Sequence, residues 1–326
     1  MAFWILAAGF LLLVAGSETV LRGGVAFARG WNMPALPIGL LVISASIAAP
    51  AFSVSLQAVL RQQPEIALAS IVGGNILSLL LVVGLGALLR PLSSAPKVVL
   101  RDGGALLVAI AVLFFFLLDG KLVRLEALIL LGGLIAYLVL IFFTDWRRAA
   151  DNSVALAHAE YRLKDTTSMS GGFFMILFGL VSLFLGGRFT LSGGMALARV
   201  YEVSPELVGL TVVAFGTVLP LIVMTLAAAL RGDVPLAAGQ ILISSVWNIL
   251  GVLAGVTLVH AWKISPMLPA QDVPLMGASA VLLLALLSIQ WRVGRGRGLL
   301  LVLAYGAYLV FLAWRQGLWT PATLGL

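Results

Sequence analysis

The sequence predicts an all-α polytopic membrane protein with ten transmembrane helices, arranged as two inverted five-helix repeats. Hydrophobic residues make up 62% of the 326 residues, charged residues make up 10%, and the mean hydropathy is +1.14. Soluble domains carry about 25% charged residues, so this chain has too few charges to cover a surface exposed to water. We therefore expect lipid to be the solvent for most of its surface.

Ten apolar segments are long enough to cross a bilayer, which takes about 20 residues of helix. The predicted spans are about 3–28, 35–60, 66–90, 98–118, 123–143, 172–198, 205–230, 234–260, 271–290 and 298–316. The first span lacks the basic start of a signal peptide, so we expect it to be retained. The chain then divides into a first five-helix repeat over 1–143, a cytoplasmic linker over 144–171 and a second repeat over 172–326.

An internal repeat supports the five-plus-five arrangement. Residues 39–78 match residues 209–248 without a gap at an offset of 170. Several residues of the first copy recur unchanged 170 positions later, namely Gly23–Gly24, Ala28–Arg29, Gly39–Leu40, Pro50, Leu56, Leu60 and Arg61. Because five is an odd number of spans, the second repeat must lie upside down relative to the first. Inverted repeats with helices interrupted near the bilayer midplane are typical of secondary transporters.

The distribution of basic residues predicts the orientation. Twelve of the 20 Lys and Arg residues fall at the span ends of one side, and six fall at the other side. Since basic residues accumulate on the cytoplasmic side, we expect both the N-terminus and the C-terminus to lie outside. We expect an integral protein of a bacterial inner (cell) membrane. The net charge of +7 then reflects orientation, and we expect no nucleic acid partner.

The composition also argues against an enzyme. The chain has no cysteine, and its two histidines lack the spacing of a zinc site. No phosphate-binding loop or pair of nucleophile and base is present in the sequence. We therefore expect no catalytic residues, no cofactor and no resident metal. The sequence does not specify an oligomeric state.

A motif in the second half resembles a known family. Residues Val213-Ala-Phe-Gly-Thr-Val-Leu-Pro220, preceded by Ser204-Pro-Glu-Leu-Val-Gly-Leu210, are similar to the second α-repeat of the calcium/cation antiporter superfamily, which includes the sodium/calcium exchangers. The first half shows the motif more weakly, at Pro50, residues 64–68 and residues 73–76. The resemblance covers essentially the whole chain. It implies cation antiport between spans 2, 3, 7 and 8, with the bilayer and a small inorganic cation as partners.

The resemblance also indicates which positions would bind the ion. The central glutamates of the family fall at Ala51 and Leu221, so neither carboxylate is retained. The candidate ion-binding residues that remain polar are Ser78, Thr217, Ser244, Asn248, Asn75 and Gln240. Three functions stay open: a cation antiporter resembling sodium/calcium exchangers, a sodium or proton exchanger without calcium, and a transport-inactive scaffold or partner subunit. The transported cation would be Na⁺ or Ca²⁺.

Other residues in the spans have two interpretations each. Pro50 and Pro220 predict either a helix break that forms the site or a simple kink. Glu18 is the carboxylate that lies clearly inside a predicted span, and Arg22 follows at the i,i+4 spacing of an ion pair, while Arg188 occupies the repeat position of Glu18. These three residues could form a proton relay or a structural ion pair. Three carboxylates at predicted helix starts suit the helix dipole or attract cations to the entrances of the site: Glu65, Glu206 and Asp233.

Overall fold

The computed structural model describes residues 1–30, 42–146, 168–231, 234–263 and 268–317. Within this part of the chain, nine helices are long and apolar enough to cross a membrane, and α3 is a tenth, shorter apolar helix. The prediction of ten membrane helices is confirmed. Most of the 144–171 linker and Asp233 lie outside the described residues.

The elements of the first half follow the predicted spans. In order they are α1 (Ala2–Gly30), α3 (Ser44–Leu60), α4 (Pro64–Leu77), η2 (Ser78–Val82), α5 (Val83–Leu89), β1 (Leu92–Ser93), α6 (Pro96–Phe116), η3 (Leu117–Asp119), β2 (Lys121–Leu122) and α7 (Arg124–Trp146). The π-helical segment η2 joins α4 and α5 into one membrane-length helix. Proline occupies the first helical position of α4 and α6, where its missing N–H costs no hydrogen bond.

The second half repeats this order. Its elements are α9 (Met169–Val200), α10 (Pro205–Val208), η4 (Gly209–Val213), α11 (Ala214–Arg231), α12 (Val234–Trp247), η5 (Asn248–Leu253), α13 (Ala254–Val259), β3 (Trp262–Lys263), η6 (Leu268–Asp272), α14 (Val273–Ser288), β4 (Arg292–Val293) and α15 (Arg295–Arg315). Ser204 caps α10 by accepting a hydrogen bond from the backbone N–H of Leu207 at 3.1 Å. The short α10 and the π-helical η4 lead directly into α11.

Two short ribbons show that the halves are inverted. The loop after α5 pairs with the loop after α14, with Leu92 opposite Val293, and the loop after α6 pairs with the loop after α13, with Leu122 opposite Trp262. Each ribbon therefore joins the loop after the third span of one half to the loop after the fourth span of the other. Since successive loops lie on opposite sides of a membrane, the two halves must run in opposite directions.

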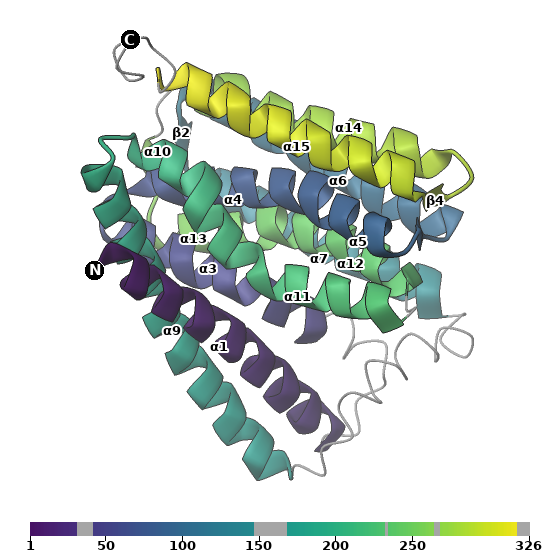
Figure 1. The fold of residues 1–326 in the computed structure, drawn as a ribbon. Helices are drawn as coiled ribbons and strands as arrows, with labels where there is room; N and C mark the ends of the chain where they lie inside the picture. The colour runs from purple at the N-terminus through teal and green to yellow at the C-terminus, as the bar shows by residue number, and fades with distance from the viewer. Residues whose placement is uncertain (31–41, 147–167, 232–233, 264–267, 318–326) are drawn as a thin grey trace.

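Helices α1 and α9 pack side by side and run obliquely to the rest of the bundle (Figure 1). Glycine recurs every seven residues along both helices, and a Cβ at Gly9, Gly16 or Gly23 would lie within 3.0 Å of the α9 backbone. The hydroxyl of Ser182 donates to the backbone carbonyl of Leu12 at 2.8 Å, between residues 170 positions apart. Small residues permit this close approach, as in many membrane helix pairs.

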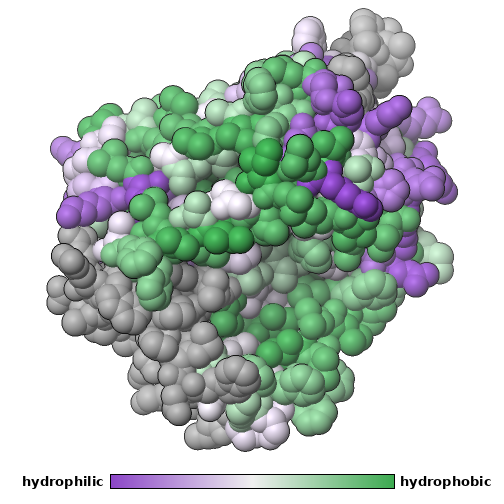
Figure 2. Space-filling view, turned by 180° about the vertical axis from the view of Figure 1, so that it is seen from behind, coloured by the Kyte–Doolittle hydropathy of each residue, from purple (hydrophilic) through white to green (hydrophobic). Residues whose placement is uncertain are grey.

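The outer surface suits a lipid environment. Figure 2 shows hydrophobic residues over much of the described part of one face, with hydrophilic residues at its upper left edge and along its upper right and right edges. Large apolar side chains are exposed along α7 and α9, including Phe143, Phe174 and Phe178. In water such a surface would aggregate, whereas in a bilayer it is solvated by acyl chains.

Candidate functional site

The candidate site lies where four helices meet at the middle of the bundle. Helices α3 and α11 come from equivalent positions of the two halves, as do α4 and α12 (Figure 1). Both α4 and α12 change to a π-helical turn at a candidate residue, Ser78 in η2 and Asn248 in η5. Such π-helical turns often mark functional positions because they widen the helix and redirect side chains.

An amide pair connects the two halves at this point. Asn248 donates from Nδ2 to Oδ1 of Asn75 at 3.0 Å. Asn75 donates from Nδ2 toward the backbone carbonyl of Ser245 at 3.4 Å, and its Nδ2 lies 3.6 Å from Sδ of Met276. Asn75 and Ser245 are 170 positions apart, so this contact lies on the axis that relates the repeats.

The predicted hydroxyl residues are buried on the helices that carry the amide pair or on the neighbouring α11. Thr217 is buried and donates to the backbone carbonyl of Ala214 at 2.9 Å, and a Cβ at Gly74 would lie 3.7 Å from its Oγ1. Thr217 therefore faces α4 one residue before Asn75. Ser78 and Ser244 are also buried, at 2% and 4% exposure. Asn75, Asn248 and Thr217 therefore lie together, while Ser78 follows Asn75 by about one helical turn and Ser244 precedes Asn248 by about one turn.

The positions of the two absent glutamates are apolar and closed to solvent. Ala51 is 6% exposed and Leu221 is 2% exposed. Among the described residues, no group of three or more His, Cys, Asp or Glu side chains is placed to hold a metal ion. The site therefore offers neutral oxygens as ligands.

Several polar atoms in and near the site are buried without a hydrogen-bond partner in the described structure. Oδ1 of Asn248 and the hydroxyls of Ser55 and Ser245 belong to this group. A buried acceptor without a partner costs about 1–3 kcal/mol, so such atoms usually meet water or a ligand. Gln240 also has an unpartnered Nε2, but it lies two turns before Asn248 on α12 and makes no hydrogen bond to the amide pair.

The prolines do not interrupt their helices. Pro50 lies inside the continuous helix α3, and Pro220 lies inside the continuous helix α11. The irregular backbone is found instead in η4, at Gly209–Val213, and in the π-helical turns at Ser78 and Asn248. The ring of Trp247 lies against Gly251, which also faces Leu134 of α7.

The predicted charged group on α1 is an ion pair. Oε1 of Glu18 accepts from Nε of Arg22 at 2.8 Å, and both side chains are more than two-fifths exposed. Arg188 is exposed on α9 and forms no ion pair with the described residues. These residues lie outside the four-helix site.

Sequence reasoning missed the buried carboxylates. Asp102 and Asp272 are both fully buried in membrane-length helices and occupy equivalent positions at the offset of 170. Asp102 accepts from Nε of Arg101 at 2.7 Å, whereas Asp272 accepts from Nη1 of Arg315 at 2.8 Å. Their identity at matched repeat positions is a sequence signal that could have revealed them.

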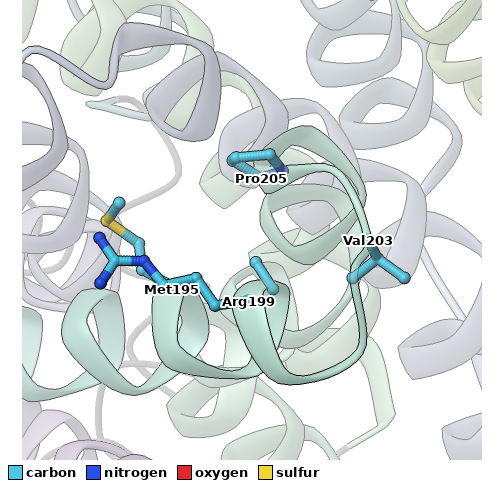
Figure 3. Close-up of a pocket in the computed structure, with 5 residues that line it drawn as sticks. Met195, Arg199, Val203 and Pro205 are labelled. Carbon is cyan, nitrogen blue, oxygen red and sulfur yellow. The ribbon is translucent and has the colours of Figure 1, made fainter.

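A separate pocket lies at the turn between α9 and α10. It has a volume of about 280 Å³ and is lined by Met195, Ala198, Arg199, Val203 and Pro205. Figure 3 shows the side chain of Arg199 lying back along α9 toward Met195. This pocket borders the start of α10 and is distinct from the four-helix site.

Comparisons with known proteins agree with this fold. A family model described as "Sodium/calcium exchanger protein" matches residues 1–143 and 171–314. CaxA of Alkalimonas amylolytica is 30% identical over 92% of this chain and 95% of its own length, and the inner membrane protein YrbG of Escherichia coli K12 is 29% identical over 95% of this chain and 96% of its own. A solved structure of the sodium-calcium exchanger NCX_Mj is 23% identical, covers 95% of this chain and 97% of its own, and has a TM-score of 0.64.

The family model matches well over half of the chain, and it matches both halves of the inverted repeat. The likeness to NCX_Mj shows the same fold over nearly the whole length. The chain belongs to the sodium/calcium exchanger family of membrane cation transporters, and it is not an enzyme.

Proposed function

We propose that this protein is a secondary antiporter that carries a monovalent cation, sodium, and does not carry calcium. The observation that carries the proposal is the amide pair of Asn75 and Asn248 in a site without carboxylates. Within this pair, Oδ1 of Asn248 is buried and accepts no hydrogen bond from the described residues. Ser78, Thr217 and Ser244 are buried hydroxyl residues of the same helices, and we propose that they supply further neutral oxygens.

The physical argument concerns the cost of dehydrating the ion. Calcium takes six to eight oxygens, and selective calcium sites include carboxylates that compensate its double charge. With Ala51 and Leu221 at the positions of the family's glutamates, a dehydrated divalent ion would keep a large uncompensated desolvation cost. Neutral hydroxyl and carbonyl oxygens are sufficient for a monovalent ion, as in channel filters and transporter half-helices.

The relatives support transport as the activity. MaX1 of Methanosarcina acetivorans, which is 27% identical over 95% of this chain, is named a sodium/calcium exchanger. Inverted halves are the arrangement that permits alternating access to a central site. In this proposal α1 and α9 move together against the four-helix core. The Lys and Arg distribution supports outside termini, and the name of the E. coli relative supports an inner-membrane location.

The test is sodium counterflow in liposomes. Purified protein is reconstituted with unlabelled sodium inside, and uptake of radioactive sodium from outside is followed with and without external calcium. We expect saturable sodium uptake in which calcium is a weak competitor. Sodium-driven calcium uptake would show instead the activity named for MaX1, and a complete lack of flux would favour a transport-inactive scaffold.

Two matched variants connect the flux to the site. Asn248→Leu removes the unpartnered oxygen and the bond to Asn75, and we expect it to abolish sodium uptake. Ser288→Ala removes an exposed hydroxyl at the end of α14 and should leave uptake unchanged. Equal uptake by wild type and Asn248→Leu, with both proteins folded, would contradict the proposed site.

A further inference from the structure

One arginine is shared by two buried carboxylates near the start of α10. Arg315, at the end of α15, donates from Nη1 to Oδ2 of Asp272 at 2.8 Å and from Nη2 to Oε1 of Glu206 at 3.4 Å. Nη1 also donates to the side-chain oxygen of Gln271 at 3.2 Å. The side chains of Arg315, Asp272 and Glu206 are 6%, 0% and 11% exposed. We call these three residues the Arg315 cluster.

The charges of the Arg315 cluster do not balance. With both carboxylates ionised, one guanidinium faces two negative charges at a site with little water. An uncompensated buried charge is costly, and two carboxylates that share a site resist simultaneous ionisation. The other charged or titratable groups near the cluster are Glu65 of α4, which adds a negative charge, Tyr305 and Tyr308 of α15, and Arg199 of α9 beside Pro205.

The two carboxylates of the Arg315 cluster differ in the donors that they meet. Asp272 is fully buried and faces both the guanidinium of Arg315 and the hydroxyl of Tyr308. Among the described residues, the side-chain donor printed for Glu206 is Arg315, at the longer distance of 3.4 Å. An additional proton is therefore favoured on Glu206, the carboxylate with the weaker set of donors.

The first half of the chain has a different arrangement at the matching positions. Asp102 corresponds to Asp272, but the residue that corresponds to Glu206 is Leu36, and the one that corresponds to Arg315 is Asp145. Asp102 pairs instead with Arg101, which also donates to the Thr144 hydroxyl at 3.0 Å. The sequence thus has a carboxylate, Glu206, in the second half, whereas the equivalent position of the inverted first half, on the other side of the membrane, is Leu36.

We propose that the Arg315 cluster binds one proton, with Glu206 as the carboxylate that exchanges it, and that this proton controls the attachment of α10 to α15. Glu206 is the exchanging group because its bond to Arg315 is the longer one and its side chain is the more exposed. The role in coupling rests on the proposed function, whereas proton binding itself requires no transport.

The consequence follows from the position of Glu206. Ionised Glu206 attracts Arg315 and holds the first turn of α10 against the end of α15. Protonation of Glu206 removes that attraction and leaves Arg315 paired with Asp272. Because α10 continues through η4 into α11, which carries Thr217, the released turn can transmit the change toward the ion site. Acid on this side of the membrane therefore loosens α10.

The experiment measures amide hydrogen exchange of residues 205–213 in purified protein, at acidic and alkaline pH, after correction for the intrinsic exchange rate. For wild type we expect protection of this segment to fall about tenfold on acidification. Glu206→Gln, which imitates the protonated side chain, should show the low protection at both pH values. Asp119→Asn alters an exposed carboxylate and should behave as wild type.

Each outcome is decisive for the proposed proton site. A Glu206→Gln protein that retains the pH response, or a wild-type segment without one, would overturn the proposal. At acidic pH the proposal makes Glu206 protonated, so that it is equivalent to glutamine. A Glu206→Gln protein that does not fold at acidic pH, where wild type folds, would therefore also contradict the proposal. Sodium counterflow on the same preparations separates the two proposals, since loss of flux with an intact pH response would overturn the proposed function alone.

Discussion

At three positions in the centre of the bundle, the second half of the chain supplies polar side chains where the first half supplies smaller or apolar ones. The polar residues are Thr217, Ser244 and Asn248, and their counterparts at the offset of 170 are Ile47, Gly74 and Ser78. The first half instead allows close packing, because Gly73 lies directly against the backbone of Leu210 in η4. The two halves share one fold, yet they differ in the polarity and in the closeness of packing of their central helices.

The same difference holds at the ends of the spans. Asp102 and Asp272 are matched and buried, yet the second aspartate shares its arginine with Glu206 from a different span. An inverted repeat requires equivalent helix positions, but it does not require equivalent side chains. Sites on the two sides of the membrane can therefore respond to different conditions.

The largest expected effect comes from removing the shared cation. Arg315→Gln leaves two buried carboxylates without a counter-charge, and breaking a buried ion pair in this way costs about 3–5 kcal/mol. The free energy of unfolding, or the midpoint of thermal unfolding in detergent, should fall, and should fall further as the pH rises because both carboxylates must then ionise. Arg124→Gln, at an exposed position of α7, is the control. Equal losses in the two variants would mean that the Arg315 cluster contributes no stability of its own.

A smaller effect is expected where the first half packs more closely than the second. Gly73→Ala places a methyl group against the backbone of Leu210 and should cost about 1–3 kcal/mol of stability by overpacking. Its counterpart in the second half, Ile243, already carries a side chain. Gly104→Ala, where a Cβ would meet open space, should be neutral or slightly stabilising. Thermal unfolding of the two variants checks the difference.

Restoring the missing carboxylates should create divalent affinity. The double variant Ala51→Glu with Leu221→Glu should raise calcium affinity by about tenfold, or about 1.4 kcal/mol, if the two side chains face one site. Isothermal calorimetry of wild type, each single variant and the double variant measures this gain and shows which half contributes more. A folded double variant without added calcium affinity would show that these positions do not face the ion site.

The smallest effect is expected from the ion pair on α1. Glu18→Gln removes a pair whose two side chains are 46% and 43% exposed, so stability should change by at most about 0.5 kcal/mol. Sodium counterflow should also remain unchanged, because Glu18 lies outside the four-helix site. A large loss of flux would identify Glu18 as part of a proton relay, and the first half would then contribute a titratable residue to transport.

The fold could be predicted from the sequence because its signals are local or repeated. Hydropathy marks each span over about 20 residues, and a repeat of five spans, an odd number, requires an inverted second half. The four-helix site followed from the resemblance, but its central contact did not. The bond between Asn75 and Asn248 depends on how α4 and α12 approach each other, which neither segment specifies alone.

The Arg315 cluster was beyond sequence reasoning for a related reason. Glu206 and Arg315 are 109 positions apart, and each lies at a span end, where a charge is usually explained by the helix dipole or by the interface. The chemistry of the cluster arises only when three elements meet. One signal was present in the sequence: aspartate occurs at both 102 and 272, which are equivalent positions of the two repeats.

The central claim is that an acid-free site between the halves holds a monovalent cation. A crystal structure of the protein soaked in a thallium(I) salt tests it most directly, since thallium substitutes for small monovalent cations and scatters anomalously. We predict an anomalous peak beside Oδ1 of Asn248, within reach of Thr217 or Ser244, that added sodium displaces and calcium does not. An anomalous map without a peak there, with the side chains closed around Asn75 and Asn248, would contradict the account.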